Sequence, residues 1–156
     1  MLNALAIIFH LVAINIWVGG MFFIIFVLGK VVSTLEVPAQ QAFWQHTLKR
    51  FFFWVWLAVI GLLGTGIGMI LYRFGGVANT PWYILAMASL GISMAVIFMV
   101  IYFVFYKNFE HEFNTGNIEG SRYQLRIIRR LGIVNMVLGV LCCGCDWRQS
   151  IPGLIL

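Results

Sequence analysis

Residues 2–29 read LNALAIIFHLVAINIWVGGMFFIIFVLG, a stretch without aspartate, glutamate, lysine or arginine. An α-helix rises 1.5 Å per residue, so about 20 apolar residues are enough to cross the hydrocarbon core of a bilayer. This stretch clears that length. It has no basic segment before it and no small-residue cleavage pattern after it, and it is longer than the apolar core of a signal peptide. We therefore expect a retained transmembrane helix.

Three more uncharged and mostly apolar stretches follow, from Phe51 to Tyr72, from Pro81 to Tyr106 and from Leu131 to Cys145. The first two of these clear the membrane-crossing length, and the last is short. We expect an all-α fold, a membrane-spanning four-helix bundle that forms one domain over residues 1–156. Its helices are predicted at about 2–29, 51–73, 81–106 and 128–145, with an atypical tail at 142–156.

The composition excludes an ordinary soluble domain. Hydrophobic residues make up 62% of the chain and charged residues 10%, and the mean hydropathy is +0.97. Soluble domains carry about 25% charged residues. No catalytic serine arrangement and no phosphate-binding glycine loop is present, so the sequence favours no soluble enzyme class. Any chemistry must be sought among facing helices.

The basic residues predict the orientation. Most of the 10 lysines and arginines lie either between the first and second stretches or between the third and fourth. These residues are Lys30, Lys49, Arg50, Lys107, Arg122, Arg126, Arg129 and Arg130. Because positively charged loops stay in the cytoplasm, we expect both termini to face the outer side of the membrane. The net charge of +5 also predicts contact with anionic membrane lipid, and without a nucleic-acid motif it predicts no nucleic-acid partner.

Small residues predict where the helices pack, because they let backbones approach closely in lipid. The candidates are Gly61, Gly64, Gly66 and Gly68 in the second stretch, Gly91 and Ala95 in the third, and Gly132 and Gly139 in the fourth. The basic residues Arg122, Arg126 and Arg129 have i, i+4, i+7 spacing, which places them on one face of a helix. This spacing predicts that the fourth helix begins before its apolar stretch, at the cytoplasmic interface.

His10 is the most informative candidate for a functional residue. Ionisable groups at membrane depth usually face the bundle interior or a cavity. Trp17 shares its helical face, and Gly20, three residues further on, lets a neighbouring helix or cofactor come close. A neutral imidazole can ligate copper or haem iron through one nitrogen while the other donates a hydrogen bond. We predict a cofactor-binding site of His10, Trp17 and Gly20 with His10 as the metal ligand. A histidine hydrogen-bonded between helices fits the same pattern.

Cysteines form a second candidate metal site. Cys142 and Cys145 have C-x-x-C spacing at the outer end of the fourth stretch. Thiolates favour Cu(I), and they can also be oxidised, since the predicted location is the oxidising side of the membrane. Cysteine is equally an ordinary small apolar residue inside proteins. Cys142 and Cys145 therefore remain metal-ligand candidates beside a plain packing role.

A set of motifs resembles the CopD-like (copper resistance D) family of bacterial membrane proteins. It includes the segments HLVAINIWVGGMFF at residues 10–23 and RFFFWVW at 50–56, glycines at 75–76, and IRRLGIVN at 128–135 with LG at 138–139. The resemblance implies a copper-handling protein of the bacterial inner (cytoplasmic) membrane with His10 as candidate ligand, and the predicted orientation then makes both termini periplasmic. Relatives often place a histidine late in the third helix, whereas residues 98–103 contain none, and the tail from Cys142 does not resemble the family.

The architecture is also similar to that of HemJ-type protoporphyrinogen oxidases, which have a histidine in the first helix and are associated with haem b. Three functions follow from these resemblances and from the glycines. The first is handling or transport of copper, and the second is a haem-b-binding membrane oxidoreductase with His10 as axial ligand. The third is a non-catalytic accessory subunit whose helices dock onto other membrane subunits or onto a second copy of the chain.

Overall fold

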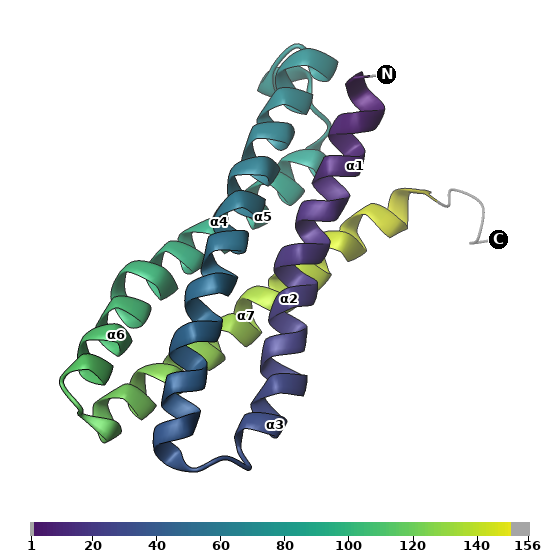
Figure 1. Cartoon of the computed structure of the whole chain (residues 1–156). Helices are drawn as coiled ribbons and strands as arrows, with labels where there is room; N and C mark the ends of the chain where they lie inside the picture. The colour runs from purple at the N-terminus through teal and green to yellow at the C-terminus, as the bar shows by residue number, and fades with distance from the viewer. Residues whose placement is uncertain (1, 151–156) are drawn as a thin grey trace.

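The computed structural model describes residues 2–150, which form four long helices joined by short connections (Figure 1). The first helix is continuous but changes its winding, since two wider π-helical segments interrupt its α-helical parts. Its segments are α1 (Leu2–Ile14), η1 (Asn15–Gly19), α2 (Gly20–Phe22), η2 (Phe23–Leu28) and α3 (Gly29–Val32). No strand occurs among these described residues, so the predicted all-α class is confirmed.

The other three helices are longer. The second is α4 (Val37–Phe74), which is followed by the short 3₁₀ turn η3 (Val77–Asn79). The third consists of α5 (Trp82–Val100), the π-helical segment η4 (Ile101–Tyr106) and α6 (Lys107–Asn114), and the fourth is α7 (Ile118–Ser150).

Three segments are long and apolar enough to cross a membrane: Ile7–Val32, Val37–Tyr72 and Trp82–Asn114. Many large apolar side chains point outward from them, among them Phe9, Ile60 and Phe103, which are 69%, 62% and 59% exposed. In water such a surface would be unfavourable, whereas acyl chains cover it without cost. The chain is a multi-pass membrane protein.

Two helices begin earlier than their apolar stretches predict. α4 starts at Val37 instead of near residue 51, and α7 starts at Ile118 instead of near residue 128. An apolar run marks only the part of a helix that lipid surrounds. The polar turns at the start of α4 are helical because Pro38 suits the first turn of a helix, and because Gln41 and Leu48 are buried against the bundle. The expected loops therefore shrink to residues 33–36 and 115–117.

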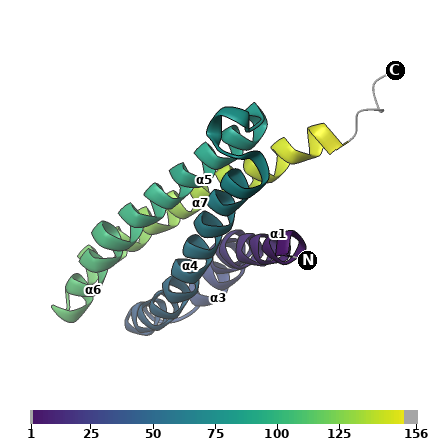
Figure 2. The same ribbon diagram turned by 90° about the horizontal axis from the view of Figure 1, so that it is seen from above.

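The four helices associate in two pairs. α1 packs along α4, and α5 and α6 pack along α7, which also crosses the first helix (Figures 1 and 2). The hydrophobic core lies where the pairs meet. The ring of Phe98, fully buried, lies 5.8 Å from that of Phe52, 5.2 Å from that of Trp56 and 6.1 Å from that of Trp17. Rings from three helices thus interlock at centroid distances favourable for aromatic pairs.

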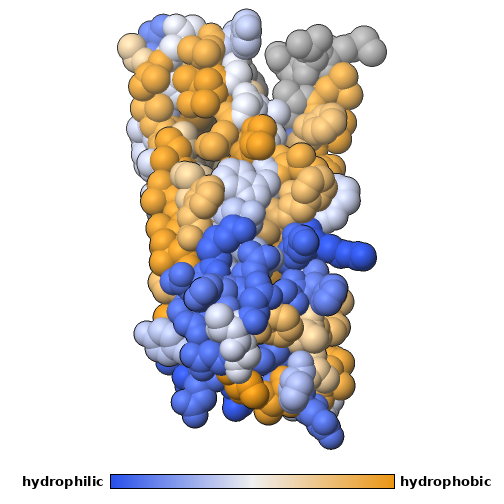
Figure 3. Space-filling view, turned by 60° about the vertical axis from the view of Figure 1, so that its left-hand side comes forward, coloured by the Kyte–Doolittle hydropathy of each residue, from blue (hydrophilic) through white to orange (hydrophobic). Residues whose placement is uncertain are grey.

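Polar residues concentrate toward the end that carries the α3–α4 and α6–α7 connections. Figure 3 shows hydrophilic residues over the lower part of one face and apolar residues above them. The early turns of α4 and α7 belong to this polar end. The bundle therefore has an apolar end with α1 and the α4–α5 connection, called the outer end here, and a polar, basic end.

The glycines do not all pack as their spacing predicts. A Cβ on Gly139 would lie 2.6 Å from Val18 Cγ2, and one on Gly132 would lie 3.3 Å from Ile25 Cδ1, so both allow α7 to approach the first helix. A Cβ on Gly61, Gly64, Gly66 or Gly68 would meet no atom within 4 Å, and the same holds for Gly91. The prediction of close helix packing is confirmed for α7. For the α4 glycines and Gly91 it is wrong within the described bundle.

Candidate functional site

His10 lies half-buried on α1 and faces α4. Its Nδ1 is 2.8 Å from Oγ1 of Thr65. The hydroxyl of Thr65 in turn donates to the carbonyl oxygen of Gly61, at 2.7 Å. The expectation that His10 faces another helix of the bundle is met, and its partner is a hydroxyl, as expected for a histidine hydrogen-bonded between helices.

This chain of hydrogen bonds selects one tautomer of the imidazole. A hydroxyl has a single proton, and the short bond to Gly61 uses that of Thr65. When Thr65 donates to Gly61, its Oγ1 accepts from His10, and Nδ1 of a neutral His10 then carries the ring proton. Nε2 is left with a free lone pair, which is the arrangement in which a metal-binding histidine is held by a second hydrogen bond.

Trp17 and Gly20 have other neighbours. Trp17 is 3% exposed and packs edge-on against Phe98, and no acceptor for its indole N–H lies among the described residues. Gly20 faces α4, where an added Cβ would lie 2.7 Å from the ring of Phe51. The three predicted site residues therefore contact different side chains. Of the three, His10 is the one that contacts a polar group.

The cysteine pair is only partly described. Sγ of Cys142 lies 3.8 Å from the carbonyl oxygen of Met87 on α5, a contact different from that of His10. The side chain of Cys145 lies outside the described residues. Within the part of the chain whose side chains are placed, no group of three or more histidine, cysteine, aspartate or glutamate residues could hold a metal ion.

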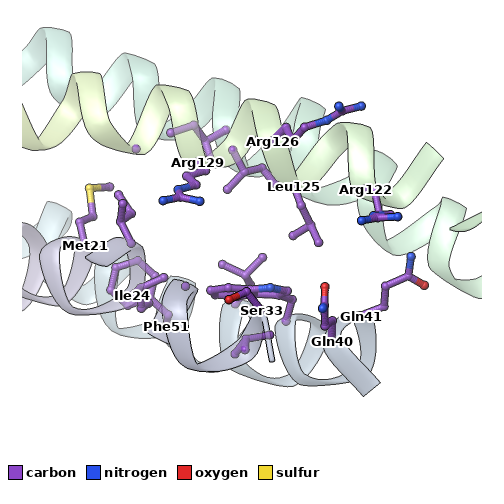
Figure 4. Close-up of a pocket in the computed structure, with 18 of the residues that line it drawn as sticks. Met21, Ile24, Ser33, Gln40, Gln41, Phe51, Arg122, Leu125, Arg126 and Arg129 are labelled. Atoms are coloured by element: carbon purple, nitrogen blue, oxygen red, sulfur yellow. The ribbon is translucent and has the colours of Figure 1, made fainter. Parts of the chain in front are cut away.

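A cavity at the basic end was not predicted. It has a volume of about 730 Å³ and lies between the first helix, the start of α4 and the start of α7. Its apolar part includes Met21, Ile24 and Phe51, and Figure 4 shows Arg122 and Arg129 reaching toward it from α7. The i, i+4, i+7 spacing of Arg122, Arg126 and Arg129 was the feature of the sequence that pointed to this part of the molecule.

Glutamines from α4 complete the polar rim of the cavity. Gln41 is 6% exposed and donates to Ser121 Oγ at 2.6 Å and to the carbonyl oxygen of Ile118 at 3.1 Å. Gln40 and Ser33 also line the cavity. Sequence reasoning missed the glutamines because they precede the apolar stretch and were assigned to a loop.

Like the indole of Trp17, the buried amide group of Asn135 lacks hydrogen-bond partners among the described residues. Asn135 on α7 is fully buried between Gly132 and Gly139, and neither atom of its amide group has a hydrogen-bond partner among the described residues. Burying an amide in this state costs roughly 1–3 kcal/mol. The amide of Asn135 therefore makes no interhelical hydrogen bond inside the described bundle.

The sequence pattern of the family described as copper resistance protein D matches residues 45–145. The match runs from the middle of the first half of α4 to near the end of α7. The chain belongs to this family. None of the curated proteins and none of the solved structures matches the chain. The matched range begins after the first helix, so the assignment to the copper resistance protein D family does not depend on His10.

Proposed function

We propose that this member of the copper resistance protein D family handles copper within the bacterial inner membrane, with His10 as a copper ligand. The observation that carries the proposal is the family match over residues 45–145. Copper is the cargo here and not a resident cofactor. The tautomer that Thr65 imposes on His10 supports the ligand role, because it leaves Nε2 free for a metal ion.

The thioether of Met69, a soft metal ligand, lies on the same face of α4 as Thr65. Met69 follows Thr65 by four residues and therefore lies on the same helical face, one turn closer to the outer end. Thioether sulfur favours Cu(I). A pair of donors, one imidazole and one thioether, holds an ion less firmly than a closed four-ligand site, and transport requires that the ion can leave again.

The positions of the basic residues predict the side of the membrane from which copper reaches His10. The basic ends of α4 and α7 carry the lysines and arginines and should remain in the cytoplasm. In this orientation, which the basic residues predict, His10 and both termini lie toward the periplasmic side. We propose that copper meets the chain from that side.

Cu(I) titration tests the proposal directly. The full-length protein in lipid nanodiscs is titrated against a colorimetric Cu(I) chelator, together with His10→Ala, Met69→Leu and His46→Ala. His46 is the matched control, because it is an exposed imidazole near the opposite end of α4. We expect His10→Ala to remove the tight Cu(I) binding, Met69→Leu to weaken it, and His46→Ala to leave it unchanged. Equal binding by the wild type and His10→Ala would show that His10 is no ligand.

A haem-b oxidoreductase is the alternative that the same histidine tautomer supports, since an axial ligand also needs a free Nε2. An absorbance spectrum of the purified protein separates the two. A reducible Soret band that His10→Ala abolishes would favour haem and would count against copper as the natural ligand.

An accessory role in a larger membrane complex is favoured by a different observation. Gly61, Gly64 and Gly68 share one face of α4 at i, i+3, i+7 spacing, and an added Cβ on any of them would meet no atom within 4 Å, so this face can meet another helix. The second helix can come from another subunit or from a second copy of the chain. Co-purification with a stable membrane partner, together with no copper binding and no Soret band, would favour this role.

A further inference from the structure

The cavity at the basic end combines an apolar wall with a polar rim. Met21, Ile24 and Ile25 of the first helix and Leu48 and Phe51 of α4 supply apolar surface. The rim consists of Ser33, Gln40, Gln41, Glu119, Arg122, Arg126 and Arg129. A volume of about 730 Å³ is typical of a small-molecule site.

Two arginines point into this cavity. In Figure 4 the guanidinium groups of Arg122 and Arg129 extend from α7 toward α4 and the first helix. Arg126 turns away, and its guanidinium carbon lies 6.0 Å above the ring of Tyr123. The cavity thus has two inward cations on one helix, seven residues or about 10 Å apart.

These cations lack an acidic partner in the bundle. Within the described part of the chain, the ion pair that forms joins Lys107 to Glu110 on α6, away from the cavity. One carboxylate, Glu119, lines the cavity, so the two inward arginines against one glutamate leave a net positive lining. Guanidinium groups bind phosphate oxygens with two parallel hydrogen bonds, so the lining suits a phosphate better than a neutral headgroup.

The apolar wall decides between a free anion and a lipid. The residues that line it belong to Ile7–Val32 and Val37–Tyr72, two segments that can cross the membrane. Gly132, three residues beyond Arg129, and Ile25 both line the cavity, and an added Cβ on Gly132 would lie 3.3 Å from Ile25 Cδ1, so the cavity borders the crossing of α7 and the first helix. A free phosphate would leave this wall facing water, whereas acyl chains would cover it. Basic pockets between transmembrane helices commonly hold the headgroups of anionic lipids.

We propose that this cavity is a binding site for one anionic phospholipid. The phosphate lies against Arg129 or Arg122, hydroxyl groups of the headgroup bond to Gln40 and Ser33, and the first acyl carbons lie along Ile24 and Phe51. The bound lipid joins the start of α7 to the first helix pair, beside the hydrogen bonds of Gln41. This site is separate from the proposed copper site at His10, which lies toward the other end of the first helix.

Native mass spectrometry of the full-length, delipidated protein in detergent tests the proposal. Phosphatidylglycerol, cardiolipin and phosphatidylcholine with the same acyl chains are titrated in turn, and inorganic phosphate is added as a competitor. The variants are Arg122→Gln, Arg129→Gln and the double substitution. Arg130→Gln is the matched control, because it removes the same charge from the same helix but does not line the cavity. Circular dichroism checks that each variant keeps its helix content.

We expect one phosphatidylglycerol or cardiolipin to bind in preference to phosphatidylcholine. Each cavity substitution should weaken this binding about fivefold, which corresponds to the usual contribution of one basic residue at an anionic membrane surface. Arg130→Gln should change it by less than about twofold, since its charge lies outside the cavity. Equal binding of both headgroup types would overturn the proposal, as would equal losses from Arg130→Gln and Arg129→Gln. Displacement of the lipid by inorganic phosphate would identify a site for a free anion instead.

Discussion

Two sets of glycines in this molecule behave in opposite ways. Where α7 crosses the first helix, Gly132 and Gly139 are packed so closely that a methyl group at either position would meet a side chain. In the outer half of α4, Gly64 and Gly68 have the spacing most often associated with close helix contact, yet an added Cβ at either would meet nothing within 4 Å. Glycine allows close packing where α7 crosses the first helix, whereas in the outer half of α4 the glycines are not packed against a neighbouring helix of the described bundle.

The difference shows that small-residue spacing marks a surface able to pack, not the partner that packs there. The α7 glycines face the β-branched Val18 and the long side chain of Ile25, which fill the space that glycine leaves. The α4 glycines surround Thr65, whose partner on α1 is the imidazole of His10 and not another small residue. A helix held at the distance of a hydrogen-bonded imidazole does not come close enough to contact the glycines beside it.

The largest effect should come from filling the tight crossing. Gly139→Ala places a methyl group 2.6 Å from Val18 Cγ2 and 3.1 Å from Met94 Cε, so we expect a loss of about 1–3 kcal/mol from overpacking. Gly64→Ala should leave stability unchanged or slightly raise it, because alanine is the better helix former and the space is open. Unfolding in mixed micelles, followed by circular dichroism, measures both.

The reverse ranking would be informative. If Gly64→Ala destabilised the protein more than Gly139→Ala, the α4 glycines would be packed against a second chain in the purified sample. Size-exclusion chromatography of both variants would then show whether an oligomer had been lost.

Much of the fold could be predicted from the sequence, because lipid imposes a simple rule. Apolar length identified three membrane-crossing segments, and the spacing of Arg122, Arg126 and Arg129 correctly indicated helix before the last apolar stretch. The start of α4 at Val37 was missed because its first turns are polar. Pro38 after an extended Glu36 was the available signal, since proline favours the first turn of a helix.

The candidate site was less accessible to sequence reasoning. A buried histidine predicts a polar partner, but Thr65 is 55 residues away and nothing in one sequence identifies it. The inward arginines were visible as a face, whereas their neighbours Gln40 and Gln41 come from another helix. Tertiary pairing, and not local pattern, decides which polar residues meet.

A smaller effect of opposite sign should come from the buried amide of the tight crossing. Asn135→Ala removes an amide group whose atoms lack partners in the described bundle, so we expect stability to rise by about 1 kcal/mol. Ser121→Ala is the control, because Ser121 is equally buried on α7 but its hydroxyl accepts from Gln41 and donates to the carbonyl oxygen of Ile118. That variant should be destabilised in the same unfolding experiment. If Asn135→Ala were the more harmful change, the amide would have a partner from another molecule, either a ligand or a second chain.

The smallest change in stability should come from the loosely packed region, at the bond between His10 and Thr65. Hydrogen bonds between membrane helices contribute about 0.6 kcal/mol on average, so Thr65→Val should lower stability by about that amount, and Thr65→Ser should preserve it. Copper affinity should respond more strongly, by about tenfold, because Thr65→Val leaves the imidazole free to protonate either nitrogen. Thr65→Ser retains the acceptor that fixes the tautomer and should bind Cu(I) like the wild type. A structural histidine would show only the stability change, with the same Cu(I) titration for all three proteins. If Thr65→Val lost Cu(I) affinity and Thr65→Ser kept it, the hydroxyl at this position would be orienting a metal ligand.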